Sequence, residues 1–216
     1  MVGVDVRVRH AEQVPDATAC AKCAGASDVL LRTKSGAVCL DCAGLAHLEF
    51  LPAGSAALTR RAVKLSRSPV VVMQKSLRRF RYRGQSMYER QGILAEPAAI
   101  EAAALASLAD AGVRGSDGIA ELIRELFPGC PTNRADAIAL HTAASLCGRG
   151  RQRLTVPEIG PDAVREAVTA SVLHVDTDYD QLVASGLDRE TARARVFNRV
   201  EEVLRAWRDG VSLLDS

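Results

Sequence analysis

Residues 18–44 read TACAKCAGASDVLLRTKSGAVCLDCAG. Two Cys-x-x-Cys pairs stand in this stretch, Cys20 with Cys23 and Cys39 with Cys42, and fifteen residues separate them. The spacing is typical of zinc sites, because each short pair turns two thiolates toward one ion and two pairs complete the tetrahedron that Zn²⁺ prefers. It predicts one structural Zn²⁺ bound by the four thiolates, since a closed shell leaves no coordination position for a substrate.

The residues between the two pairs fit a small hairpin. Residues 29–31 are apolar, residues 34–36 are typical of a turn, and residues 37–38 begin the return strand. So small a module needs its metal in order to fold. Two redox-active cysteine pairs are the alternative interpretation of the same spacing.

On either side of the hairpin the pattern is that of short strands. Valines alternate with other residues over residues 2–8, which is the period of a half-buried strand. Together with the cysteine hairpin, this strand predicts a zinc-ribbon module over residues 1–47. The second unit, residues 48–95, is predicted to be strand–helix–strand with a basic arm. Its elements are a strand and turn over 48–54, a helix capped by Ser55 and ending near Ser66, a short strand over 70–73, and a loop or irregular arm over 75–92.

From residue 96 to residue 210 the sequence predicts a helical domain. Helix-favouring residues dominate, and glycines and prolines divide them. The expected helices cover residues 97–111, 119–127, 132–147, 161–174 and 188–207. The predicted fold class is therefore α+β, with an N-terminal zinc ribbon and a small β element followed by a mainly α-helical domain.

Positive charge is concentrated in one segment. Between residues 60 and 90 there are ten Lys or Arg and one acid, so this segment carries +9, and the rest of the chain carries −7 against a net charge of +2. Arginine forks suit phosphate oxygens, and interleaved aromatic rings such as Phe80 can stack on unpaired bases. The alternative is that these arginines pair with the acidic helical half. The residues expected to contact nucleic acid are Arg60, Arg61, Lys64, Arg78, Arg79, Arg81, Tyr82 and Arg83.

The segment 174–180, which reads HVDTDYD, admits two interpretations. In the first, His174 pairs with a carboxylate and acts as a general base, with Tyr179, Asp180 and Arg193 completing a catalytic centre. In the second, Thr177 and Asp180 form a capping box, and His174 sits at the C-terminus of the preceding helix. A single helix over residues 161–184 is a further possibility.

The pattern His174-x-x-Thr177-x-Tyr179-Asp180-x-Leu182 resembles that of a known family, domain of unknown function 2293. The stretch 126–131, LFPGCP, and the run from residue 50 to residue 92 fit the same family, so the resemblance covers most of residues 48–208. The family implies no established activity.

Together these features predict a zinc-ribbon-containing protein that binds nucleic acid, with RNA or single-stranded DNA as the expected partner. The alternatives are a nuclease-like enzyme centred on His174, Tyr179 and Asp180, and a protein-interaction adaptor that uses the acidic helical face. No run approaches the eighteen apolar residues of a membrane span, and the N-terminus has no apolar signal core. The sequence therefore predicts a cytoplasmic protein without membrane contact, whose six cysteines are thiols or metal ligands.

Overall fold

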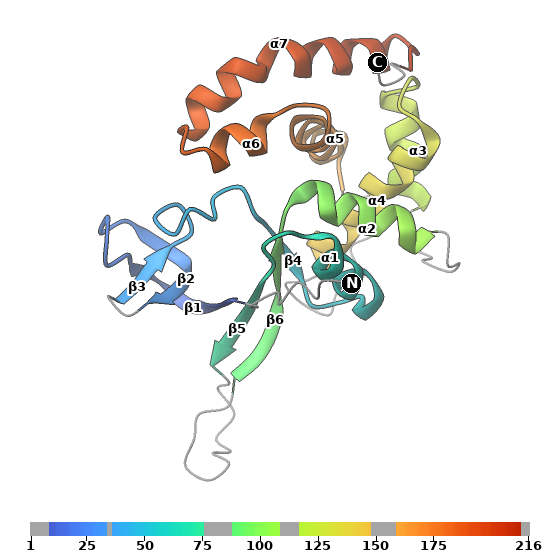
Figure 1. Cartoon of the computed structure of the whole chain (residues 1–216). Helices are drawn as coiled ribbons and strands as arrows, with labels where there is room; N and C mark the ends of the chain where they lie inside the picture. Colours follow the sequence, from blue (N-terminus) through green and yellow to red (C-terminus); the bar gives the residue numbers. More distant parts are fainter. Residues whose placement is uncertain (1–8, 34–35, 76–87, 109–116, 148–158, 213–216) are drawn as a thin grey trace, which may run out of the picture.

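A computed structural model of the chain describes residues 9–33, 36–75, 88–108, 117–147 and 159–212. Strands dominate the first part of the chain, where α1 alone stands between β4 and β5 among the described residues, and helices make up the rest, so the fold is α+β, as predicted. In Figure 1 the strands β1, β2 and β3 lie to the left of β5 and β6, and helices α1 to α4 lie to their right, with α5, α6 and α7 above. None of the described helices is both long enough and apolar enough to cross a membrane.

One six-stranded sheet runs in the order β3-β2-β1-β5-β6-β4. All neighbouring strands are antiparallel except β1 and β5, which are parallel. The sheet therefore joins the cysteine hairpin to the strands that follow residue 48. Its strands are β1 (Arg9–Ala19), β2 (Ala26–Thr33), β3 (Gly36–Cys39), β4 (Glu49–Pro52), β5 (Val70–Lys75) and β6 (Tyr88–Ala95).

Strand β6 shows why its start was not recognised in the sequence. Residues 88–92 were expected to belong to an irregular arm, and this expectation is wrong, because they pair with β5 and extend the strand. Residues 88–90 are exposed, whereas residues 92–95 are all buried. Neither the exposed start nor the buried end alternates between apolar and polar residues, so the strand carries no period of two that the sequence could reveal.

The two faces of this sheet meet different parts of the protein. Ile93 and Ala95 pack with α1 (Ala56–Leu65) and α2 (Pro97–Leu108), whereas Leu94 packs on the opposite face with Leu45 and Leu48. Successive strand residues point to opposite faces, so β6 contributes to both cores.

Gly92 marks a close approach between strands. A Cβ at this position would lie 2.3 Å from the carbonyl oxygen of Leu51 and 2.7 Å from the ring of Phe50, both on the neighbouring strand β4. Only glycine fits such an approach. It also sits where the pairing of β5 with β6 shifts register, between Val72 and Met73.

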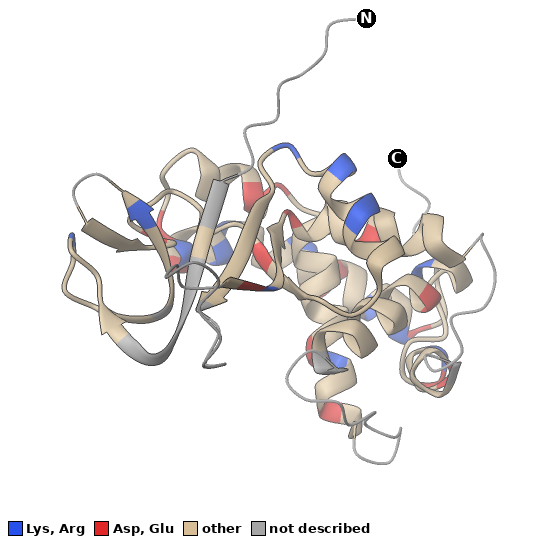
Figure 2. Cartoon of the chain, turned by 90° about the horizontal axis from the view of Figure 1, so that it is seen from below, with Lys and Arg blue, Asp and Glu red and all other residues tan. Residues whose placement is uncertain are grey.

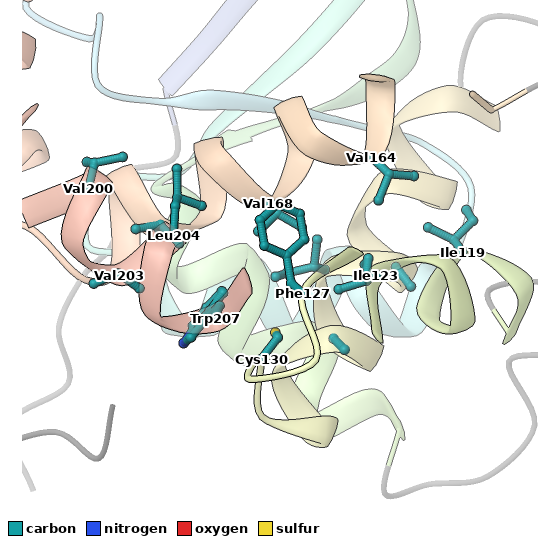
Figure 3. Close-up of a cluster of buried hydrophobic side chains, with 14 of the residues drawn as sticks. Ile119, Ile123, Phe127, Cys130, Val164, Val168, Val200, Val203, Leu204 and Trp207 are labelled. Atoms are coloured by element: carbon teal, nitrogen blue, oxygen red, sulfur yellow. The ribbon is translucent and has the colours of Figure 1, made fainter. Parts of the chain in front are cut away.

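Five further helices follow α2 within the described residues, and they share one large apolar core. Their bounds are α3 (Asp117–Leu126), α4 (Thr132–Cys147), α5 (Pro161–Val175), α6 (Tyr179–Ala184) and α7 (Arg189–Arg208). Figure 3 shows Phe127 and Val168 at the centre of this core, with Trp207 of α7 and Cys130 beside them. Helix α4 links the two halves, because Ala135 and Ile138 face this core while other α4 residues face the sheet-side core.

Most of the predicted elements are confirmed within the described residues. Ser55 caps α1 by accepting the Leu58 amide at 3.3 Å, and Ser66 is its C-cap. The hairpin between the cysteine pairs is present as β2 and β3. The valine-rich residues 1–8 lie outside the described residues, so that part of the expected first strand stays a prediction.

Candidate functional site

The four cysteines of the two Cys-x-x-Cys pairs come together beside strands β1, β2 and β3, which lie on the left in Figure 1. Cys20 follows β1, Cys23 lies in the turn before β2, Cys39 ends β3, and Cys42 lies in the next turn. Their four sulfur atoms all lie within 4.8 Å of one another. Residues nineteen apart in sequence thus meet because the hairpin returns the chain to its own start.

The spacing of the sulfur atoms suits one tetrahedral ion. The Sγ atoms of Cys23 and Cys39 lie 3.8 Å apart. A tetrahedral zinc with Zn–S bonds of about 2.3 Å places its sulfurs about 3.8 Å apart. Backbone amides also point at the sulfurs: the Cys39 amide donates to Cys20 Sγ at 3.2 Å, and the Lys22 amide does so at 3.4 Å.

The pKa values of two of these thiols shift in opposite directions, because backbone amides surround one sulfur and other sulfurs surround the second. Amide donors, first that of Cys39, lower the pKa of Cys20 to about 6. The neighbouring sulfurs, first that of Cys39, raise the pKa of Cys42 to about 12. Thiolates this close together repel one another, and a bound cation would compensate their charge. The cluster is suited to bind one metal ion, which would fill its whole shell.

Of the residues expected to contact nucleic acid, the three on α1 lie within the described part. Arg60 is exposed, and its Nε–H donates to the carbonyl of Ala56 at 3.1 Å. Lys64 is also exposed, whereas Arg61 is half-buried and donates to Ser107 Oγ at 2.9 Å. Figure 2 shows basic and acidic segments mixed along the helices. The remaining expected contacts, Arg78, Arg79, Arg81, Tyr82 and Arg83, lie outside the described residues.

The structure brings three of the four proposed catalytic residues together. His174 Nδ1 lies 2.7 Å from Asp180 Oδ1, and its ring meets the ring of Tyr179 edge-on with centroids 5.3 Å apart. Tyr179 is buried, and the His174 and Asp180 side chains are 20% and 15% exposed. Arg193 is exposed on α7 and does not line the cavity that His174 lines.

The break between α5 and α6 is what turns Asp180 back to His174. Helix α5 ends at Val175, so a single helix over residues 161–184 is wrong. Thr177 is not the N-cap of α6, which is Asp178. Instead the Thr177 hydroxyl donates to the carbonyl of Leu173 and accepts the Tyr179 amide at 3.2 Å. This one side chain satisfies backbone groups on both sides of the break.

His174 also lines a cavity of about 160 Å³ between β4, α2, α4 and α5. The walls are mostly apolar, and three further titratable groups, Glu49, Glu101 and His141, line the same space. His141 Nε2 lies 3.1 Å from Glu49 Oε1 without the alignment of a hydrogen bond. Burial acts to lower the pKa of His141, but the neighbouring Glu49 outweighs this and raises it. Burial acts to raise the pKa of Glu49, but the neighbouring His141 outweighs this and lowers it.

A buried ionic network lies next to this cavity, and the sequence analysis did not find it. Arg134 of α4 pairs with Glu101 of α2 and makes a bidentate pair with Asp176 at 2.8 and 3.1 Å. Ser171 donates to Glu101 at 2.6 Å, and the Arg134 guanidinium lies 5.5 Å from the centre of the Trp207 ring. The network ties α2, α4, α5 and α7 together.

The pKa shifts within this network follow from sharing one cation between two acids. Burial raises the pKa of Glu101, and the repulsion of Asp176 adds to this, although Arg134 opposes both. Despite burial, Asp176 and Glu101 raise the pKa of Arg134. Arg134 therefore stays charged, and the network would leave an unpaired buried charge if either side were removed.

One feature of the sequence could have indicated this network. Helix α2 reads PAAIEAAALASL, and Glu101 is its one charged residue. A carboxylate within an apolar helix needs a buried cation, because an isolated charge is very costly to bury. The partner, Arg134, has no such signal, since a single arginine near the start of a polar helix is ordinary.

A known family model matches most of the helical domain. The model of the family described as uncharacterized conserved protein (DUF2293) matches residues 122–208, which begins within α3 and ends with α7. The matched residues include Arg134, Ser171, Asp176 and the pair His174–Asp180. Residues 48–121 lie outside the match. No curated protein and no solved structure was found to match the chain. Residues 122–208 of this chain thus match the DUF2293 family of uncharacterized conserved proteins.

Proposed function

We propose that this protein is a zinc-containing, nucleic-acid-binding protein of the cytoplasm, with RNA or single-stranded DNA as its partner. The observation that carries the proposal is the ladder between β5 and β6. Lys75 and Tyr88 are register partners at its end, so the chain segment between them starts and finishes on adjacent strands of the sheet that bears the cysteine cluster. By sequence that segment contains Arg78, Arg79, Arg81 and Arg83.

Zinc is the metal that this donor set favours. Four thiolates in a tetrahedron suit Zn²⁺ or an iron–sulfur centre, and paired Cys-x-x-Cys turns with a hairpin between them are typical of zinc ribbons. The amide donors to Cys20 stabilise its thiolate form. The metal would be structural, because no coordination position stays open.

The chemistry of the basic segment supports a flexible, single-stranded polymer rather than a duplex. Arginines there alternate with the aromatic residues Phe80 and Tyr82. Tyr88, at the end of the described ladder, is 45% exposed, so its ring is available to stack on a base. Stacking on unpaired bases favours RNA loops and single-stranded DNA.

The test is a binding titration of the full chain against single-stranded RNA, single-stranded DNA and duplex DNA at several salt concentrations. Replacing Arg78, Arg79, Arg81 and Arg83 with Ala should weaken binding to every sequence alike, because phosphate contacts carry little sequence information. The slope of log K against log salt should become shallower by about 0.7–0.9 per lost contact.

A matched control removes the same charge elsewhere. Arg193, Arg195, Arg205 and Arg208 are exposed on α7, and changing these four to Ala should leave both affinity and salt slope nearly unchanged. Equal losses in the two variants would mean that net charge alone attracts the polymer. Unchanged binding in the first variant would contradict the proposal.

A nuclease-like activity is the second proposal, and the contact between His174 and Asp180 favours it. A carboxylate that holds one imidazole nitrogen orients the other for proton transfer. His174→Ala should then abolish degradation of a bound strand while binding persists. If the wild-type protein leaves every polymer intact, the enzymatic proposal fails and the binding proposal stands.

A further inference from the structure

The segment between the second cysteine pair and β4 is a single run of hydrogen-bonded turns. Its backbone amides join Ala43 to Cys39, Leu45 to Leu40 and Leu48 to Leu45, at 3.0, 2.8 and 3.0 Å. Because these hydrogen bonds overlap in sequence, a displacement of the cysteine pair is passed along the segment toward β4.

The helical domain contacts this segment through Arg189, the first residue of α7. The Arg189 guanidinium donates to the carbonyl of Ala46 at 2.7 Å and lies 3.4 Å from Asp41 Oδ1. Asp41 stands between the two cysteines of the pair, and Ala46 follows them closely. In Figure 1 the chain that follows β3 passes below the junction of α6 with α7. The helical domain therefore touches the candidate metal site within a few residues of its sulfurs.

Local hydrogen bonds at the α6–α7 junction determine where Arg189 lies. Gly186 has φ of 98°, and the amides of residues 186 and 187 donate to carbonyls in the last turn of α6, which ends that helix. Asp188 then caps α7 by accepting the Thr191 amide at 2.9 Å. Side chains of a helix point toward its N-terminus, so Arg189 extends from the start of α7 toward the cysteine pair.

The junction also bears on the pair of His174 with Asp180. Asp180 belongs to α6, a helix of six residues in which Tyr179 is the buried residue. A helix this short has little stability of its own and depends on its flanks for its position. A contact that holds the start of α7 therefore also helps to hold Asp180 at 2.7 Å from His174.

We propose that the metal state of the cysteine cluster controls the α6–α7 junction through Arg189. With a metal bound, the cysteines fix the segment, and Asp41 and Ala46 stay within reach of Arg189. In the metal-free protein the crowded thiolates repel one another, the segment moves, and the junction loses this anchor. Such a coupling is reciprocal, so Arg189 in turn strengthens metal binding. The inference rests on the metal-binding part of the proposed function and does not involve nucleic acid.

The first measurement is the zinc affinity of the full-length protein, obtained by competition with a chelator. Arg189→Ala should weaken zinc binding about fivefold, at the lower end of the range for coupled sites, because the Arg189 side chain is 52% exposed. Asp188 keeps its capping role in this variant, so α7 should still form. The control Arg205→Ala removes the same charge from an exposed position near the other end of α7 and should keep the wild-type affinity.

The second measurement is amide hydrogen exchange at Gly186, Leu187 and Thr191, the hydrogen-bonded amides of the junction. In the wild-type protein, removal of zinc should speed this exchange by about the same factor of five, because the coupling is reciprocal. In Arg189→Ala the exchange should be fast with and without zinc. The amides of α5 and of the later turns of α7 should not respond, since their core does not include the sulfurs.

Three results overturn the coupling. The first is equal zinc affinity in Arg189→Ala and the wild type, and the second is an equal loss in Arg205→Ala, which would assign the effect to net charge. The third is junction exchange that does not respond to zinc in the wild type, which would mean that Arg189 only compensates charge near the sulfurs. A wild-type protein that binds no zinc contradicts the metal-binding proposal and this inference with it, whereas failure to bind any polynucleotide affects neither measurement.

Discussion

The cysteine hairpin and the helical domain are stabilised in opposite ways. Around the sulfurs, the described buried cluster has four members, Cys20, Leu30, Val38 and Cys39, and two of them are metal-ligand candidates. The helical core has nineteen buried members in its described part. A cluster as small as the first buries too little apolar surface to offset the conformational entropy of its chain, whereas the second is large enough to hold five helices together.

The difference teaches where a metal is needed in this protein. In the hairpin a bound metal would replace the missing core, because binding energy at such sites is folding energy. In the helical domain the apolar core is sufficient, and its polar interior, centred on Arg134, selects one arrangement of the helices. The two regions also touch: Arg189 at the start of α7 donates to the carbonyl of Ala46 at 2.7 Å and lies 3.4 Å from Asp41, between the last two cysteines.

Removing the metal should give the largest effect. Purified protein should contain about one zinc per chain, and Cys39→Ser or a strong chelator should release it and unfold the β1–β3 hairpin region. Helices α5 and α7 should keep their structure, since their core does not include the sulfurs. Metal analysis and amide hydrogen exchange, read separately for the two regions, check this.

The control for this prediction is a cysteine in the other region. Cys130 lies buried in the helical core, so Cys130→Ala should leave the metal content unchanged and destabilise the helices instead. A metal-free protein with a protected hairpin would contradict the comparison.

Breaking the buried network should be the next largest effect. Arg134→Ala leaves Glu101 and Asp176 without their cation, and removal of one partner from a buried pair typically costs about 3–5 kcal/mol. Denaturant unfolding followed by the fluorescence of Trp207, the one tryptophan, measures this loss.

A half-exposed ion pair between α3 and α4 serves as the control. The side chains of Arg124 and Asp136 are 37% and 33% exposed, so Arg124→Ala should cost no more than about 1 kcal/mol. Similar losses of unfolding free energy in Arg124→Ala and Arg134→Ala would show that the cost does not depend on burial of the ion pair.

The pair between Glu49 and His141 should give a smaller, pH-dependent effect. His141 has a raised pKa, so its contribution is complete below about pH 6.5 and is lost as the pH rises through the folded-state value. Glu49 has a lowered pKa, so its contribution is present above about pH 4.5 and is lost as the pH falls through its own folded-state value. The pair therefore stabilises the fold most between these limits.

Stability measured from pH 5 to pH 9 should reveal this loss, and His141→Gln should flatten it. The amplitude should stay below about 1 kcal/mol, because the Glu49 side chain is 39% exposed. An unchanged pH profile in His141→Gln would place the titrating group elsewhere.

The smallest effect concerns the turn of the first cysteine pair. Ala24 has φ of 58°, the left-handed region that costs a residue with a Cβ about 1–2 kcal/mol. Glycine removes this cost but gives up about 0.4–1 kcal/mol through its freedom in the unfolded chain. Ala24→Gly should gain about 0.5–1 kcal/mol and, through linkage, strengthen metal binding about two- to fivefold.

A chelator competition measures this gain directly. The matched control is Gly44, which has φ of 69° after the second pair, and Gly44→Ala should weaken metal binding. Equal metal affinities in all three proteins would show that these turns are not under strain.

Local patterns were enough for several features of this protein. The spacing of the cysteines predicted the cysteine cluster, because both pairs and the hairpin between them lie within 23 residues of chain. Caps and breakers likewise marked the limits of α1, α5 and α7, since Ser55, Pro161 and Asp188 act on their own helix ends. The pattern around His174 placed it at a helix end beside a carboxylate, but left its partner open between Asp178 and Asp180.

Only the tertiary structure decided what those elements enclose. The parallel pairing of β1 with β5 and the burial of β6 on both faces leave no period in the sequence, because register depends on neighbours far along the chain. The same is true of the cavity, whose Glu49, His141 and His174 come from three separate elements, and of Arg134, which meets Glu101 and Asp176 across three helices. Residues that act through local hydrogen bonds are readable in sequence, whereas burial and charge pairing depend on which elements pack together.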